Sequence, residues 1–106
     1  MIRRHITQTS YRKPGRLLPR RPQGLRGGSV LLRPREIMEW HTTGNREELL
    51  IVLVGRLQLE VQRPRRLTTC VAKAGECVLI PQGLTHRVLN RSTTNVRYLY
   101  VTGSAR

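Results

Sequence analysis

Aromatic and acidic residues are scarce in this chain of 106 residues. It has no Phe, one Trp and three Tyr, and all six acidic residues are Glu, so Asp is absent. A hydrophobic core must therefore be filled mainly by aliphatic side chains, many of which suit β-strands. At this length the chain has room for one domain with one modest core.

Cysteine is scarce as well, and long hydrophobic runs are missing. No run approaches the 18 apolar residues of a membrane helix, and the N-terminus lacks the apolar segment of a secretory signal. We therefore expect a cytoplasmic protein with no membrane partner. In that reducing compartment Cys70 and Cys77 should be free thiols. They flank a short predicted hairpin, so a disulfide between them is geometrically feasible.

Positive charge, by contrast, is abundant and unevenly spread. The formal net charge is +14, and residues 1–35 hold ten basic residues and no acid. Such a segment suits an anionic partner, including nucleic acid. However, the arm offers a single aromatic residue, Tyr11, and no convincing helix to enter a groove. Nucleic acid is therefore not the expected partner and is kept only as an alternative.

Short strands separated by turns follow residue 28, and helical periodicity is almost absent. Residues 49–54 form a continuous aliphatic run, typical of a strand buried on both faces, and residues 56–62 alternate like a half-buried strand. Further strands are expected at residues 29–32, 36–41, 67–72, 77–81, 86–90 and 96–102. The pattern predicts an all-β barrel or sandwich in residues 28–106, preceded by a basic Arg/Pro/Gly-rich arm in residues 1–27.

One segment carries a specific motif. Gly75, Pro81, Gly83, His86 and Asn90 lie at offsets 0, 6, 8, 11 and 15. This spacing resembles the second motif of the cupin superfamily, G-x5-P-x-G-x2-H-x3-N, and matches it at every fixed position. The resemblance implies a double-stranded β-helix, or jelly-roll cupin barrel, made of two antiparallel sheets.

The first cupin motif, G-x5-H-x-H-x3-4-E-x6-G, is matched in part. His41, Glu48 and Gly55 stand at the positions of its first histidine, its glutamate and its closing glycine. Thr43 occupies the place of the second histidine, and Arg35 stands where the leading glycine would be. The family's fourth metal ligand is therefore missing, so the expected affinity for metal is weaker, or water or substrate fills the position.

The resemblance implies a metal site formed by His41, Glu48 and His86. Two imidazoles and a carboxylate suit a divalent transition metal such as Fe, Mn, Ni, Zn or Cu. Glu39 has the same strand parity as His41 and is an alternative ligand. The competing interpretation is a metal-free barrel that keeps remnants of the site.

Four further residues are candidates for the pocket or for the surroundings of the metal. Thr43 can donate or accept a hydrogen bond there, and Glu39 can act beside the ligands as well as among them. Tyr98 and Tyr100 share one face of the last strand, where they either line the pocket or fill a core that has no Phe. Trp40 is expected to face away from His41, as a packing or dimer-interface residue.

Three functions stay open, because a fold does not fix a chemistry. The first is a small metal-binding cupin of unassigned activity, which holds a divalent metal and a small molecule in its barrel. The second is a metal-dependent dioxygenase or oxidase, similar to quercetinase, with Glu48 as a base. The third is a ligand-sensing or nucleic-acid-associated protein that uses the basic arm. We favour the first because it claims least.

The resemblance also implies a homodimer. Small cupins commonly pair by exchanging or abutting N-terminal strands, so the arm of residues 1–27 is expected to contribute a strand to a dimer. The outward aliphatic face of Leu49, Ile51 and Leu53 gives a partner subunit something to cover.

Overall fold

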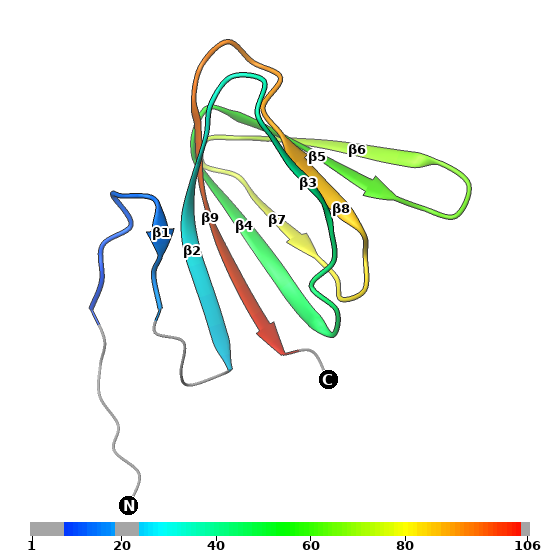
Figure 1. The fold of residues 1–106 in the computed structure, drawn as a ribbon, viewed down its shortest axis with the longest axis horizontal. Coiled ribbons are helices and arrows are strands. Elements are labelled where there is room, and N and C mark those ends of the chain that lie inside the picture. Colours follow the sequence, from blue (N-terminus) through cyan, green and yellow to red (C-terminus); the bar gives the residue numbers. More distant parts are fainter. Residues whose placement is uncertain (1–7, 19–23, 105–106) are drawn as a thin grey trace, which may run out of the picture.

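The computed structural model describes residues 8–18 and 24–104, which form nine strands and no helix (Figure 1). Residues 1–7 and 19–23 of the predicted arm lie outside the described residues. No helix that could span a membrane occurs in the described part of the chain. The strands are β1 (Gly15–Arg16), β2 (Leu25–Leu32), β3 (Ile37–His41), β4 (Arg46–Val54), β5 (Arg56–Gln62), β6 (Leu67–Lys73), β7 (Cys77–Ile80), β8 (His86–Leu89) and β9 (Val96–Ser104).

The strands form two antiparallel sheets that lie as two layers (Figure 1). One sheet has five strands in the order β1-β2-β9-β4-β7, and the other has four in the order β3-β8-β5-β6. β1 and β2, and likewise β5 and β6, are consecutive in the sequence, but the other neighbours, such as β2 and β9, come from distant parts of it. This arrangement is a jelly roll, or double-stranded β-helix, and confirms the predicted fold class.

The core follows from the alternation of side chains along the strands. In β4, Glu48, Leu50 and Val52 point inward and are buried, whereas Leu49 and Ile51 on the other face are half-buried. The aliphatic run is therefore buried on one face, not on both as its composition predicts. Leu57, Leu59 and Val61 of β5 fill the core from the opposite sheet, as their spacing predicts. The interior between the sheets is therefore mostly aliphatic, and Tyr98 is its buried aromatic residue.

A buried carboxylate departs from the predicted alternation in β5. Glu60 lies on the outward face of the strand, yet it is only 5% exposed. Arg87 of β8 covers it, with its Nε 2.6 Å from Glu60 Oε1, and also lies 4.8 Å from the ring centroid of Trp40. Trp40 therefore packs on the outer face against a cation, which agrees with its expected direction away from His41.

The cysteines are not brought together as the sequence suggested. β6, which holds Cys70, pairs with β5, whereas β7, which holds Cys77, pairs with β4 in the other sheet. The predicted hairpin is therefore wrong, because the chain crosses between the sheets at this point. Both cysteines are free and exposed.

Asn90, the last residue of the second motif, stabilises the end of the jelly roll where β2 ends and the β8–β9 loop begins. It is fully buried, and its Nδ2 donates to the carbonyl oxygens of Leu32 at 2.9 Å and Thr94 at 2.8 Å. Its Oδ1 accepts from the backbone N–H of Ser92 at 3.0 Å. One side chain thus joins the end of β2 to the loop between β8 and β9.

Both glycine positions of the first motif lie in turns with positive φ. Gly55, between β4 and β5, has φ of 85°, and a Cβ there would lie 2.6 Å from the carbonyl oxygen of Asn95. Arg35, at the position of the leading glycine, has φ of 69° and is the non-glycine residue with positive φ in the described part of the chain. The family's glycine is suited to the same left-handed conformation that Arg35 adopts here.

The described part of the arm is attached to its own barrel. β1 pairs with β2, with Arg16 opposite Gly28. The guanidinium of Arg97 donates to the carbonyl oxygen of Tyr11 at 2.9 Å and to Ser29 Oγ at 2.8 Å. β2 itself begins at Leu25, within the segment assigned to the arm. The expected role of the arm in a dimer stays a prediction.

Candidate metal centre

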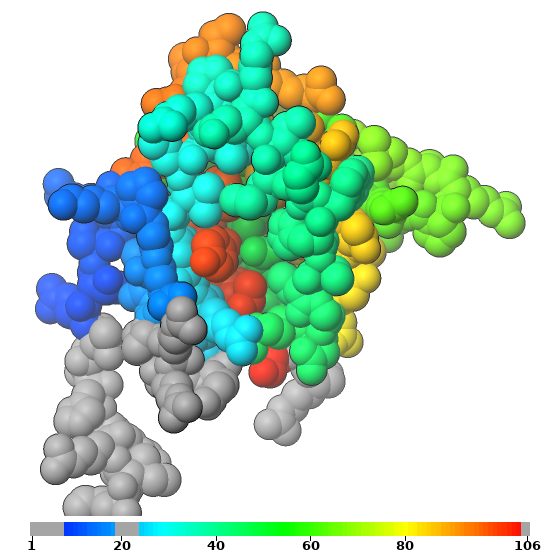
Figure 2. Space-filling model, viewed as in Figure 1, coloured from blue at the N-terminus to red at the C-terminus, as the bar shows by residue number. Residues whose placement is uncertain are grey.

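A large cavity opens between the two sheets. Its volume is about 990 Å³, and its inner walls carry apolar side chains such as Val30, Leu50 and Val88. In Figure 2 it is the hollow between the cyan atoms of β2 and the green atoms of the β3–β4 region, with red atoms of β9 at its floor. Such a volume accommodates a ligand of drug size.

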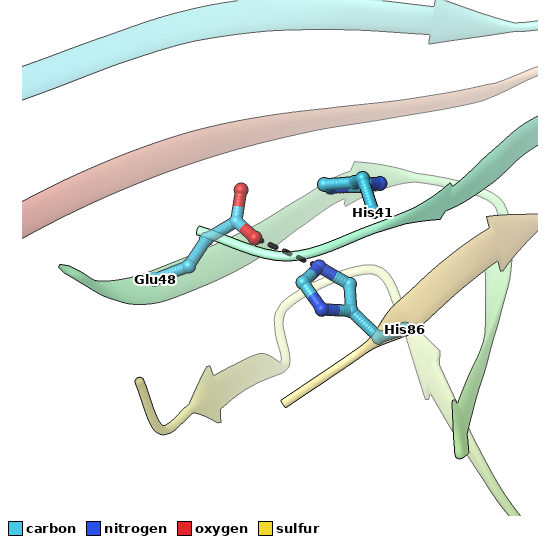
Figure 3. Close-up of side chains that lie close together, drawn as sticks. All are labelled: His41, Glu48 and His86. Atoms are coloured by element: carbon cyan, nitrogen blue, oxygen red, sulfur yellow. Dashed lines mark hydrogen bonds and ion pairs between the residues drawn. The ribbon is translucent and has the colours of Figure 1, made fainter. Parts of the chain in front are cut away.

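Three potential ligand side chains meet beside this cavity (Figure 3). His41 at the end of β3 lies opposite His86 at the start of β8, and their ring centroids are 4.4 Å apart. Glu48 reaches them from β4 in the other sheet. One ligand atom from each residue lies within 4.8 Å of the others. The jelly roll therefore assembles the three predicted ligands, which are up to 45 residues apart in sequence.

Backbone carbonyls fix the orientation of both imidazoles. Nδ1 of His41 is 2.9 Å from the carbonyl oxygen of Glu39, and Nδ1 of His86 is 2.9 Å from that of Leu84. A carbonyl oxygen only accepts, so each Nδ1 carries the proton and donates it. The lone pair of a neutral imidazole is then on Nε2, which is the usual arrangement around a metal-binding histidine.

His86 and Glu48 interact directly. Nε2 of His86 lies 3.1 Å from Oε1 of Glu48, and both side chains are buried. Burial by itself lowers the pKa of His86, but the hydrogen bonds to Glu48 and to the Leu84 carbonyl, with the charge of Glu48, outweigh it and raise that pKa above its usual value. Both nitrogens of His86 thus face oxygen acceptors, so a cation is needed on the Nε2 side: a proton or a metal ion.

These distances fit a metal ion. Around an ion with bonds of about 2.1 Å, neighbouring ligand atoms lie about 3 Å apart. The 3.1 Å between His86 and Glu48 matches this separation. All three ligand atoms lie within 4.8 Å of one another, which is wider than this separation, so the side chains would draw closer together around an ion.

Without metal, the His86–Glu48 pair should make stability depend on pH. Because the folded-state pKa of His86 is raised above 6.5, the pair stabilises the fold fully below about that pH, and the contribution is lost as pH rises through the raised pKa. Urea unfolding of EDTA-treated protein between pH 5.5 and 8.5 should show wild type losing stability relative to Glu48→Gln as pH rises. A difference that stays constant across this range would contradict the pairing.

The other four predicted site residues line the cavity but lie outside the group of potential metal ligands. The Thr43 hydroxyl donates to the carbonyl oxygen of Arg46 at 2.6 Å, and Glu39 holds His41 through its backbone. The three-residue ligand group contains neither side chain, although both line the cavity. Tyr98 and Tyr100 also line it. Burial, then the charge of Glu48 and Tyr100, raise the pKa of Tyr98 well above its usual range, so its phenol keeps its proton.

Three arginines around the cavity were not predicted from the sequence. Arg16, Arg26 and Arg46, from β1, β2 and β4, all line it. The abundance of basic residues in the first 35 positions was visible, but it did not show that two of these side chains reach the pocket. That placement depends on the pairing of β1 with β2 and of β2 with β9.

Comparisons with known proteins agree with this architecture. A sequence family described as "Cupin domain" matches residues 28–102. Among solved structures, the cupin domain of Schizosaccharomyces pombe Cnp3 is similar with a TM-score of 0.75 and 17% identity, over 87% of this chain and 60% of that one. A cupin-2 domain containing protein from Shewanella frigidimarina NCIMB 400 has a TM-score of 0.67 and 18% identity, over 92% of this chain and 84% of that one.

An oxalate oxidase is also similar, with a TM-score of 0.70 and 25% identity, over 76% of this chain. This chain spans 42% of the oxalate oxidase chain and 60% of the Cnp3 domain, less than two thirds in both comparisons. No curated protein matches in sequence. The likenesses at 17% and 18% identity support the fold alone.

Proposed function

The chain belongs to the cupin family, and from that premise we propose that it binds a divalent transition metal and a small molecule between its two sheets. His41, Glu48 and His86 would hold the metal. The observation that carries the proposal is the convergence of their ligand atoms within 4.8 Å, with both imidazoles anchored through Nδ1. Fe, Mn, Ni, Zn and Cu all accept this set of ligands.

The chain's own residues would divide the work. His86 is buried and fixed by Leu84, so it is the rigid member of the set, whereas His41 and Glu48 also line the cavity. A bound divalent ion supplies a Lewis acid with open positions toward a ligand in the cavity. The apolar walls exclude water from that ligand, and the protonated Tyr98 phenol can donate a hydrogen bond to it.

Metal content is the direct test. Untagged wild-type protein, reconstituted with each metal and desalted, should carry about one ion per chain by plasma mass spectrometry, and His86→Ala should carry less than about a tenth of that. His5→Ala removes the remaining histidine of the chain and should keep the metal. Equal metal in wild type and His86→Ala, or none in wild type after reconstitution, would reject the proposal.

An oxidase or dioxygenase is the second candidate. Two features favour it. Three protein ligands would leave open coordination positions on a metal ion, and the cavity beside the ligands has room for an organic substrate. The 25% identity to an oxalate oxidase agrees with it. In this function Glu48 would accept a proton from the substrate. Oxygen uptake by metal-loaded protein, with quercetin and with oxalate as substrates, separates this candidate from a binding protein.

We also propose a homodimer through the outer face of the five-stranded sheet. Leu49 and Ile51 of β4 lie beside Val101 and Leu99 of β9, and Leu79 of β7, 62% exposed, extends the patch. These five positions are aliphatic, so two copies of a chain with charge +14 can meet there without opposing like charges. Such self-complementarity is what a two-fold interface requires.

Light scattering tests this surface. Wild type should have about twice the 12.2 kDa mass of one chain, and Ile51→Lys should have the monomer mass, because it buries an ammonium in the interface. Val71→Lys places the same charge at an exposed position of the other sheet and should leave the dimer intact. A monomeric wild type, or a dimeric Ile51→Lys, would rule out this interface.

The exposed thiols of Cys70 and Cys77 fit the reducing, cytoplasmic location that we propose. A ligand-sensing or nucleic-acid role for the basic arm stays a prediction. It would show as nucleic-acid binding that falls steeply with salt.

A further inference from the structure

The strand register fixes where Arg16 and Arg26 lie relative to the candidate metal ligand Glu48. Residues directly opposite in antiparallel strands present their side chains on the same face of the sheet. Arg26 lies opposite Thr102, and Thr102 lies opposite Glu48, so the three form one row across β2, β9 and β4. With strands about 4.8 Å apart, Arg26 begins about 10 Å from Glu48 along this row.

The next row brings in the second arginine. Arg16 lies opposite Gly28, and Gly28 lies opposite Tyr100. A Cβ on Gly28 would come within 2.6 Å of the Tyr100 ring, so the ring lies over the glycine and toward β1. Arg16 and Arg26 therefore lie at the β1–β2 side of the cavity, with β9 between them and Glu48, and the Tyr100 ring lies over the residue opposite Arg16.

The cavity lining carries more positive than negative charge, with three Arg against two Glu. Arg16 and Arg26 form no ion pair within residues 8–18 and 24–104, where the carboxylates that pair are Glu48 and Glu60. Arg46 lines the cavity too, and its guanidinium is fixed by Thr102 at 3.0 Å and 2.9 Å. The acids of the lining are Glu39 and Glu48. The guanidinium groups of Arg16 and Arg26, which have no carboxylate partner among the described residues, are thus available to bind an anion in the cavity.

We infer that the cavity takes a small organic anion, with its carboxylate or phosphate group held by Arg16 and Arg26 and its apolar body inside. Guanidinium groups bind both kinds of oxyanion through paired N–H donors. The volume of about 990 Å³ and the walls of Val30, Leu50 and Val88 suit a ligand with an aromatic or aliphatic body. The inference rests on the proposed role of the cavity in ligand binding and names the class of ligand.

Calorimetry on EDTA-treated protein tests the arginines apart from any metal. The probes are 2-naphthoate, 2-naphthyl phosphate and the neutral 2-naphthamide, which share one ring system. We expect wild type to bind the anions at least tenfold more tightly than the amide. Arg16→Ala/Arg26→Ala should lose about tenfold or more for the anions and little for the amide. The preferred anion tells whether the ligand is a carboxylate or a phosphate ester.

A matched control removes the effect of net charge. Arg63→Ala/Arg65→Ala deletes two exposed arginines from the β5–β6 turn, outside the cavity lining, and should keep the wild-type affinity. Equal loss in both double variants, no loss in Arg16→Ala/Arg26→Ala, or no anion binding by wild type would each overturn the inference. Metal content is measured in parallel. A wild type without metal whose anion binding needs Arg16 and Arg26 would reject the metal site and retain the anion site.

Discussion

Asn90→Ala should destabilise the domain by about 3–5 kcal/mol, because one buried side chain satisfies several backbone groups. The substitution removes the donors to the carbonyl oxygens of Leu32 and Thr94 and the acceptor of the Ser92 N–H. A typical hydrogen bond contributes about 1 kcal/mol, and a buried group left without a partner costs about 1–3 kcal/mol. Urea unfolding of metal-free protein measures the change.

Two variants make this result specific to the Asn90 side chain. Asn95→Ala removes an exposed amide from the same loop and should cost less than about 0.5 kcal/mol. Asn90→Asp keeps an oxygen for Ser92 but offers no donor to the two carbonyl oxygens, so it should be nearly as damaging as Asn90→Ala. If Asn90→Asp were close to wild type, the donors would not be what holds the loop.

Gly55→Ala should cost about 3 kcal/mol or more, a large share of the stability of a small domain. Two penalties combine there: φ of 85° disfavours a side chain, and the new Cβ would lie 2.6 Å from the carbonyl oxygen of Asn95. Backbone cannot move aside as a flexible side chain can, so the turn between β4 and β5 must shift. Thermal and urea unfolding would both report the loss.

Gly75→Ala separates the two penalties. Gly75 has φ of 91°, close to that of Gly55, but a Cβ there meets nothing within 4 Å. It should therefore cost only the conformational part, about 1–2 kcal/mol. Similar costs for the two variants would show that the contact with Asn95 is relieved without strain.

Much of the fold could be predicted because burial follows alternation. The aliphatic run in β4 and the period-two pattern of β5 predicted both strands, and the spacing from Gly75 to Asn90 predicted the turn before His86. Gly83 has φ of 77° in that turn, which is the conformation its place in the motif suggests. Local patterns of this kind are complete within a few residues, so they can be read without the rest of the molecule.

Features that depend on distant pairing could not be predicted in the same way. The burial of Glu60 requires Arg87 from another strand, and the separation of Cys70 from Cys77 requires the crossing between sheets. The three candidate metal ligands could be predicted to lie together because a family motif records distant pairing indirectly. Arg16 and Arg26 belong to no such motif, so only the register of β1, β2 and β9 places them at the cavity.

The contact between Trp40 and Arg87 makes Trp40 an intrinsic fluorescent reporter of the candidate metal centre. Trp40 precedes His41 and Arg87 follows His86, so the pair joins the outer face of the two strands whose inner face presents the imidazoles. We expect a change in the spacing of those imidazoles to shift the indole against the guanidinium. Since the chain has one tryptophan, its tryptophan fluorescence comes from this position alone and should follow metal binding at the candidate centre without any label.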